Sequence, residues 1–166
     1  MSLGFFSASD LVEAAVQLEC NGHLFYTTAA DGLSSQRAKD LLHRLADDEV
    51  EHLKLFERLL TTVGLADIRE SYPGEYGVYL KAHVDSQVFT QARMTRLLAQ
   101  KAMSERDALQ FGIDSEKDAI LYYSEMIRFV PLRDRATVEG IIDEERRHLS
   151  QLVGLMKDTG LKAPLS

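Results

Sequence analysis

Two short stretches of the sequence each place a carboxylate and an imidazole three residues apart. "DDEVEHLKLF" holds Glu49 and His52, and "DEERRHLSQL" holds Glu145 and His148. Residues i and i+3 share a helix face, so each pair could bind one metal centre. A single Glu-x-x-His is weak evidence, because most such pairs are surface contacts between helical neighbours. The meaning of the repetition therefore depends on what surrounds it.

The repetition extends to the segment that precedes each pair. There a glutamate is followed seven residues later by a tyrosine, so that both side chains lie on one helix face. At an offset of 97 and then 96 residues, the repeat partners are Glu19 with Glu116, Tyr26 with Tyr123, Glu49 with Glu145 and His52 with His148. This agreement between two halves of the chain is much harder to obtain by chance than either motif alone.

The chain that carries these motifs has the composition of an ordinary globular protein. It has 166 residues, of which 45% are hydrophobic and 27% charged, and its net charge of −7 argues against nucleic acid as the main partner. No apolar run is long enough for a membrane span, and the N-terminus does not read as a signal peptide. Cys20 is the only cysteine, which excludes a disulfide framework and any multi-cysteine metal site. We therefore expect a cytoplasmic protein.

Hydrophobic periodicity predicts an all-α fold built from four helices. The predicted ranges are 9–30, 35–63, 104–129 and 131–158. Short loops within each pair predict antiparallel neighbours, and the long 64–103 connection predicts a crossover along the length of a four-helix bundle. We expect one domain over 1–166, made of the helix pair 9–63, the crossover and the helix pair 104–159.

Apolar neighbours indicate that the repeated polar residues face the interior of this bundle. Leu45 and Phe56 flank the first Glu-x-x-His, and Ile141 and Leu152 flank the second. Buried carboxylates cost several kcal/mol each, and four together also repel one another. Two divalent cations would cancel four glutamates, and oxygen and nitrogen donors suit iron or manganese. The pattern therefore predicts a two-metal carboxylate centre, with a structural polar cluster as the alternative.

Other candidates have less support from the repeat. His23 follows Glu19 by one turn but has no repeat partner, so we expect a hydrogen-bonded or solvated histidine. Cys20 is expected to be a buried small residue on another face. Glu51 and Glu144 neighbour the motifs and are expected to face elsewhere. We call Glu19 and Glu116, which lie outside the Glu-x-x-His motifs, the lone glutamates. Tyr26 and Tyr123 are either core aromatics or hydrogen-bond donors to the lone glutamates, and we favour the second role.

At these residues the sequence resembles the rubrerythrin family of the ferritin-like superfamily. The resemblance covers about 8–160 and rests on "ECNGHLFY", "DEVEHL", "SEKDAILYY" and "DEERRHL", in that order. It implies a ferritin-like four-helix bundle with a di-iron site, in which Glu49 and Glu145 bridge the metals. The ligands that it implies are Glu19, Glu49, His52, Glu116, Glu145 and His148.

Two departures from the family pattern bear on activity. Full-length rubrerythrins carry a rubredoxin domain with paired cysteines, which are absent here, so electrons are expected from a separate redoxin-type donor. Rubrerythrins also carry a further glutamate one turn after the ligand of the third helix, where this chain has Ala119. The expected function is a di-iron oxidoreductase of oxidative-stress defence, which reduces hydrogen peroxide or oxygen.

Two alternatives remain open at this point. One is a ferroxidase that handles iron, and the other is a non-catalytic bundle that binds metal for stability. We also expect a homodimer, because the apolar residues of "VYLKAHVDSQVF" in the crossover exceed what a solvated linker needs.

Overall fold

Four long helices make up nearly all of the described part of the chain. The computed structural model describes residues 8–63 and 103–160. The helices are α1 (Ala8–Gly32), α2 (Gln36–Val63), α5 (Glu105–Met126) and α6 (Arg135–Asp158). No strand occurs in these two ranges, so the predicted all-α class is confirmed.

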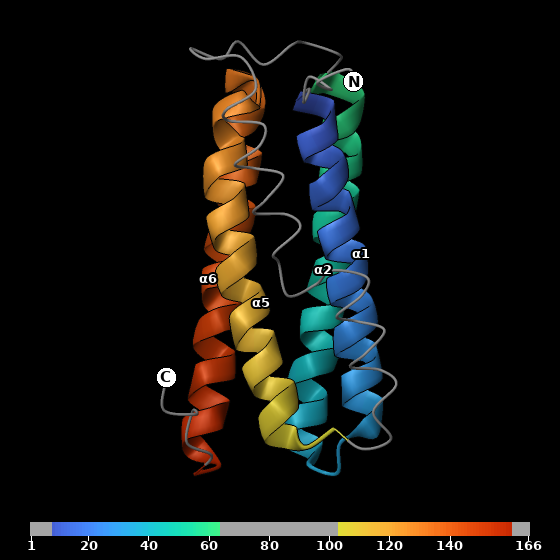
Figure 1. Ribbon diagram of the computed structural model, residues 1–166, viewed down its shortest axis with the longest axis vertical. Coiled ribbons are helices and arrows are strands. Elements are labelled where there is room, and N and C mark those ends of the chain that lie inside the picture. Colours follow the sequence, from blue (N-terminus) through green and yellow to red (C-terminus); the bar gives the residue numbers. More distant parts are fainter. Residues whose placement is uncertain (1–7, 64–102, 161–166) are drawn as a thin grey trace, which may run out of the picture.

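The helices form two antiparallel hairpins that lie side by side (Figure 1). α1 packs along α2 and α5 packs along α6, while α1 also contacts α5 and α2 contacts α6. α2 ends at the opposite end of the bundle from the start of α5 (Figure 1). This arrangement puts both hairpins around one shared interior.

Hydroxyl caps fix where two of the helices begin. Before α2, Ser35 Oγ accepts a hydrogen bond from the Ala38 amide (3.4 Å). Before α5, Ser104 Oγ accepts from the Asp107 amide (3.1 Å), as its spacing predicts. Each cap satisfies an amide that has no partner within its helix, and so sets the register of the helix that follows.

The junction between α5 and α6 differs from the prediction. The sequence predicts a fourth helix from Pro131, but Ile127–Phe129 and Leu132–Asp134 form short 3-10 turns, and α6 begins at Arg135. The Arg135 guanidinium donates to the carbonyl oxygens of Val130 and Arg128 (both 3.0 Å). These contacts hold the chain in a turn, although Pro131 is compatible with the first turn of a helix.

Apolar side chains from all four helices fill the interior on both sides of the polar cluster. The predicted stripe of α1, which includes Leu11, Ala15 and Phe25, is buried. The largest fully buried side chains are Tyr26, Tyr122, Tyr123, Phe25, Phe56, Leu11, Leu42, Leu45, Leu109 and Met126. Such a core holds the helix backbones rigidly around whatever polar groups they enclose.

Two expectations fall largely outside the described residues. The 64–103 crossover and the homodimer argument drawn from it concern a segment of which only residue 103 is described.

Within the ranges 8–63 and 103–160, no helix has the length and apolar character that crossing a membrane would require.

Candidate metal centre

The six predicted ligands lie together in the middle of the bundle. All six side chains are buried, with exposed fractions between 0 and 3%. They come from all four helices, one glutamate each from α1 and α5 and one Glu-x-x-His each from α2 and α6. The six residues are Glu19, Glu49, His52, Glu116, Glu145 and His148.

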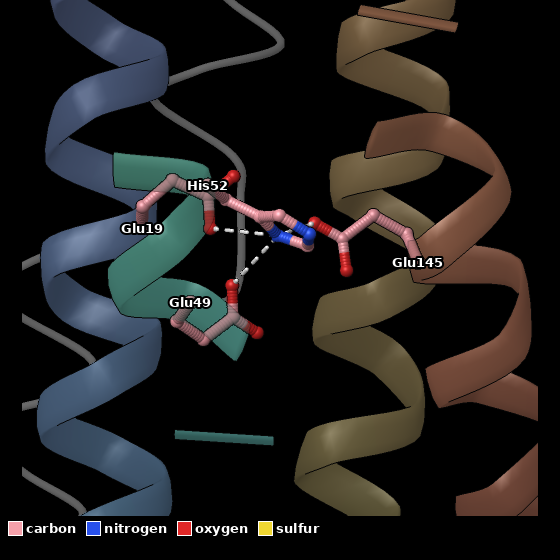
Figure 2. A group of neighbouring side chains, drawn as sticks. All are labelled: Glu19, Glu49, His52 and Glu145. Atoms are coloured by element: carbon pink, nitrogen blue, oxygen red, sulfur yellow. Dashed lines mark ion pairs between the residues drawn. The ribbon is translucent and has the colours of Figure 1, made fainter. Parts of the chain in front are cut away.

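Around His52, three carboxylates converge on one ring nitrogen (Figure 2). His52 Nδ1 lies 3.2 Å from Glu145 Oε1, 3.5 Å from Glu49 Oε2 and 3.7 Å from Glu19 Oε2. These four residues offer ligand atoms that all lie within 4.8 Å of one another. They form the first metal-sized group, which we call position 1.

Around His148, a second group of the same size forms, which we call position 2. Its ligand atoms, from Glu49, Glu116, Glu145 and His148, also lie within 4.8 Å of one another. The two imidazole rings stack with their centroids 5.6 Å apart. Glu49 and Glu145 belong to both groups, so the two positions share these two carboxylates.

Burial and mutual repulsion disturb the ionisation of this cluster. Burial, followed by the charges of Glu145 and Glu19, raises the pKa of Glu49 well above its usual value. Burial and Glu145 likewise raise the pKa of Glu116. Burial also opposes ionisation of Glu145, but its contacts with both imidazoles outweigh that effect and lower its pKa to about 2. Without metal ions to balance its charge, the cluster therefore retains protons.

The imidazole of His52 is the clearest sign that the cluster suits a metal. Burial tends to lower its pKa, but contacts with Glu145, Glu19 and Glu49 outweigh burial and raise it. Its Nδ1 is nevertheless a buried atom with no hydrogen-bond partner, which is a rare and costly state. A cation bound by the nitrogen and the surrounding carboxylates would satisfy all of them. The donor set therefore fits a metal centre.

Two tyrosines brace the lone glutamates, each across the interface between the hairpins. Tyr26 on α1 donates to Glu116 on α5, and Tyr123 on α5 donates to Glu19 on α1 (2.5 Å for the second contact). Burial and the adjacent carboxylates raise the pKa of both phenols, so both remain protonated donors. The structure shows the hydrogen bonds that sequence analysis favoured, with the partners exchanged between halves.

Two outer carboxylates hold the far nitrogens of the histidines, and sequence analysis did not foresee them. His52 Nε2 donates to Glu144 Oε2 (2.8 Å), and His148 Nε2 donates to Asp48 Oδ2 (3.2 Å). The expectation that Glu144 faces away from the site was therefore wrong. An acid precedes both Glu-x-x-His motifs at the same 96-residue offset, which is the signal that could have revealed the pair.

The remaining candidates lie outside the cluster. His23 Nδ1 contacts the Ala46 carbonyl oxygen (3.0 Å), as expected for a hydrogen-bonded histidine. Cys20 is exposed and not buried as predicted, and its thiol pKa is raised by partial burial, Glu57 and Glu19. Glu51 is exposed and pairs with Lys54 (2.7 Å), as expected.

Comparison with known proteins places this fold in a class. The chain resembles a crystal structure of a Thermotoga maritima protein assigned to the ferritin-like diiron-carboxylate proteins. The TM-score is 0.74 with 23% identity, over 93% of this chain and 97% of the other. The bundle is thus ferritin-like, with a buried carboxylate–histidine cluster that fits metal binding.

The family follows from a second comparison. The rubrerythrin family model matches residues 10–156, and the chain belongs to that family. No match is found among curated proteins.

Proposed function

We propose that the protein binds two iron ions in this cluster, one at each position. The observation that carries the proposal is the sharing of Glu49 and Glu145 between two otherwise separate groups of ligand atoms. Each position then has one imidazole, one lone glutamate and the shared pair. Four carboxylates match two divalent cations in charge, and the donor set also accepts manganese.

We further propose that the protein is an oxidoreductase that reduces hydrogen peroxide, or oxygen, with electrons from a separate redoxin-type donor. Membership of the rubrerythrin family supports this activity. When bound, two ferrous ions would supply the two electrons that convert one hydrogen peroxide molecule, with two protons, into two water molecules. The donor returns those electrons after each turnover.

The side chains of this protein would orient the metal ligands and keep the site dry. Tyr26 and Tyr123 restrain the lone glutamates, and Glu144 and Asp48 aim the histidine rings so that Nδ1 faces inward. Phe56 is buried and packs on the Tyr123 ring (centroids 4.9 Å apart), which adds apolar surface beside the hydrogen bond of Tyr123 to Glu19. These contacts fix ligand directions before metal binds, which limits reorganisation during the reaction.

Metal analysis followed by rapid mixing tests the proposal. Protein purified without added metal is assayed for bound iron and manganese, then reduced anaerobically and mixed with peroxide while its absorbance is followed. Two irons per chain, and oxidation of both with one peroxide, are expected. Rapid oxidation by oxygen followed by iron release would favour a ferroxidase. Metal binding without either reaction would mean that the site serves stability alone.

A further inference from the structure

The two metal positions differ in their surroundings although the sequence repeat makes their ligands equivalent. Building on the two-metal function proposed above, we propose that position 1, at His52, fills first and binds metal more tightly, and that position 2, at His148, fills second and exchanges its metal more readily. Two independent sets of contacts support this order, one inside the cluster and one on its outer side.

Inside the cluster, the inward nitrogens of the two histidines are in different states. His52 Nδ1 has no hydrogen-bond partner and already faces three carboxylates at 3.2–3.7 Å. His148 Nδ1 is hydrogen-bonded to Glu145 Oε2 at 2.9 Å. His148 Nδ1 also faces Glu116 (3.8 Å) and Glu49 (4.0 Å), so the two nitrogens differ in the hydrogen bond and not in the number of carboxylates around them. A metal entering position 2 must break that hydrogen bond, whereas a metal entering position 1 replaces only ion pairs at 3.2–3.7 Å. Preorganised donors bind more tightly, because less reorganisation opposes binding.

On the outer side, the carboxylates that orient the two rings are held unequally. Glu144 uses both of its oxygens, since Oε2 accepts from His52 (2.8 Å) and Oε1 pairs with Arg147 (3.0 Å). Asp48 contacts His148 at 3.2 Å, and it has no second partner within the described ranges. Glu144 and Asp48 are both about half-exposed, but the ring of His52 is held by Glu144 together with Arg147, whereas the ring of His148 is held by Asp48 alone among the described residues.

Two residues that line a hollow in the protein surface lie within about one helical turn of the residues that form the outer contact of position 2. A cavity of about 550 Å³ opens between the start of α2 and the end of α6, and Arg44 and Gln151 are among its lining residues. Arg44 precedes Asp48 by one helical turn, and Gln151 follows His148 by three residues. Solvent in a hollow lined by these near neighbours of Asp48 and His148 would favour exchange at position 2.

Partial loading identifies the position directly. The metal-free protein is crystallised with one equivalent of Co²⁺ under anaerobic conditions, and anomalous scattering locates the ion. A dominant peak between Glu19, Glu49, His52 and Glu145 is expected. A dominant peak beside Glu116 and His148, or equal peaks at both positions, would overturn the proposal. If no Co²⁺, Mn²⁺ or Fe²⁺ binds at all, the two-metal function itself fails.

Titration of outer-contact variants tests the cause. Co²⁺ absorption and calorimetry should resolve two binding steps in the unsubstituted protein, with the first at least about tenfold tighter. Glu144→Gln is expected to weaken the first step by about 10–100-fold, and Asp48→Asn to weaken mainly the second. The matched controls are the exposed neighbours Asp143→Asn and Asp47→Asn, which should change neither step. If Asp48→Asn weakens the first step and Glu144→Gln the second, the proposed order is reversed and the inference falls.

Discussion

At the scale of single residues, the shared carboxylates are the part of the site on which everything else depends. Glu49 lies in both groups of ligand atoms, so its loss removes a donor from each position. His23 lies outside the cluster and contacts only a backbone carbonyl among the described residues. We expect Glu49→Ala to abolish binding of two metals and His23→Ala to retain it. Metal content of the purified, refolded variants measures this, and two metals per chain in Glu49→Ala would contradict the assignment.

Protons held by the cluster predict an unusual pH dependence for the metal-free protein. The raised pKa of Glu116 means that the folded state keeps a proton that the unfolded state loses near pH 4.5. Unfolding then releases a proton, so stability falls as the pH rises above 4.5. The raised pKa of His52 acts in the same direction above pH 6.5. The lowered pKa of Glu145 adds stability that is lost only towards pH 2, outside this window.

Urea denaturation at pH 5 and pH 8 measures this effect. We expect the free energy of unfolding of the metal-free protein to drop by about 1 kcal/mol or more between the two values. Glu116→Gln, which cannot ionise, should show a smaller drop. An equal drop in the variant and the parent protein would mean that Glu116 does not keep its proton in the folded state.

Ala119 predicts a limit on peroxide turnover. It is buried one turn after Glu116, at the position where the resemblance to rubrerythrins implies a further glutamate. The same resemblance implies that this glutamate replaces a histidine on one iron when the centre is oxidised, so without it both histidines should stay on the metals in both oxidation states. We expect Ala119→Glu to raise peroxide consumption about tenfold, equal to about 1.4 kcal/mol of barrier, with saturating donor. Ala119→Gln, of similar size but neutral, should give no gain, and a gain in both would reject a role for the charge.

The sequence alone predicts the inner residues of the site but not their outer contacts. A repeat on an apolar helix face identifies the six buried residues, because register along a helix decides which side chains point inward. Glu144 and Asp48 are half-exposed, and whether such a side chain reaches a neighbour depends on how two helices are rotated against each other. That rotation is set by packing between hairpins, which local sequence does not encode.

At the scale of helices, Gly112 makes room for a tyrosine between α1, α5 and α6. A Cβ at Gly112 would lie 3.2 Å from Tyr26 Cε1, 3.3 Å from the Tyr26 hydroxyl and 3.2 Å from Leu152 Cδ1. Tyr26 carries the hydrogen bond to Glu116, so crowding at Gly112 should disturb position 2.

We expect Gly112→Ala to weaken metal binding at position 2 and to gain none of the usual helix stabilisation. Gly140→Ala on α6 is the control, since nothing lies within 4 Å of its Cβ. That variant should gain about 0.5–1 kcal/mol from helix propensity alone and bind metal normally. Thermal melting and Co²⁺ titration of both variants measure the difference. Equal stabilisation of the two variants, with unchanged metal binding, would show that Tyr26 moves aside freely.

Helix limits were predicted well where a side chain caps the helix, and less well where a tertiary contact decides. Ser104 and its bond to the Asp107 amide could be anticipated from spacing. The start of α6 at Arg135 could not, because the contacts of Arg135 with the carbonyls of Val130 and Arg128 depend on the turn itself.

At the scale of the whole molecule, metal should contribute strongly to stability. A ligand that binds only the folded state at 100 times its dissociation constant adds about 2.7 kcal/mol. For a domain of this size that corresponds to a rise in melting temperature of about 5–10 °C. We expect chelation to reverse this rise in the unsubstituted protein and to leave the melting temperature of Glu49→Ala unchanged. Calorimetry with and without chelator measures it, and an equal shift in both proteins would place the stabilising metal elsewhere.

The exchange of outer contacts between the hairpins has a consequence for protein engineering. Tyr26 donates to Glu116 and Tyr123 donates to Glu19, while Glu144 accepts from His52 and Asp48 accepts from His148. A designer who transplanted the α1–α2 hairpin into another scaffold would carry His52 and Glu19 without the groups that aim them. The smallest portable module is therefore the complete bundle, and a chimera of two relatives should be joined so that both members of each contact come from the same parent.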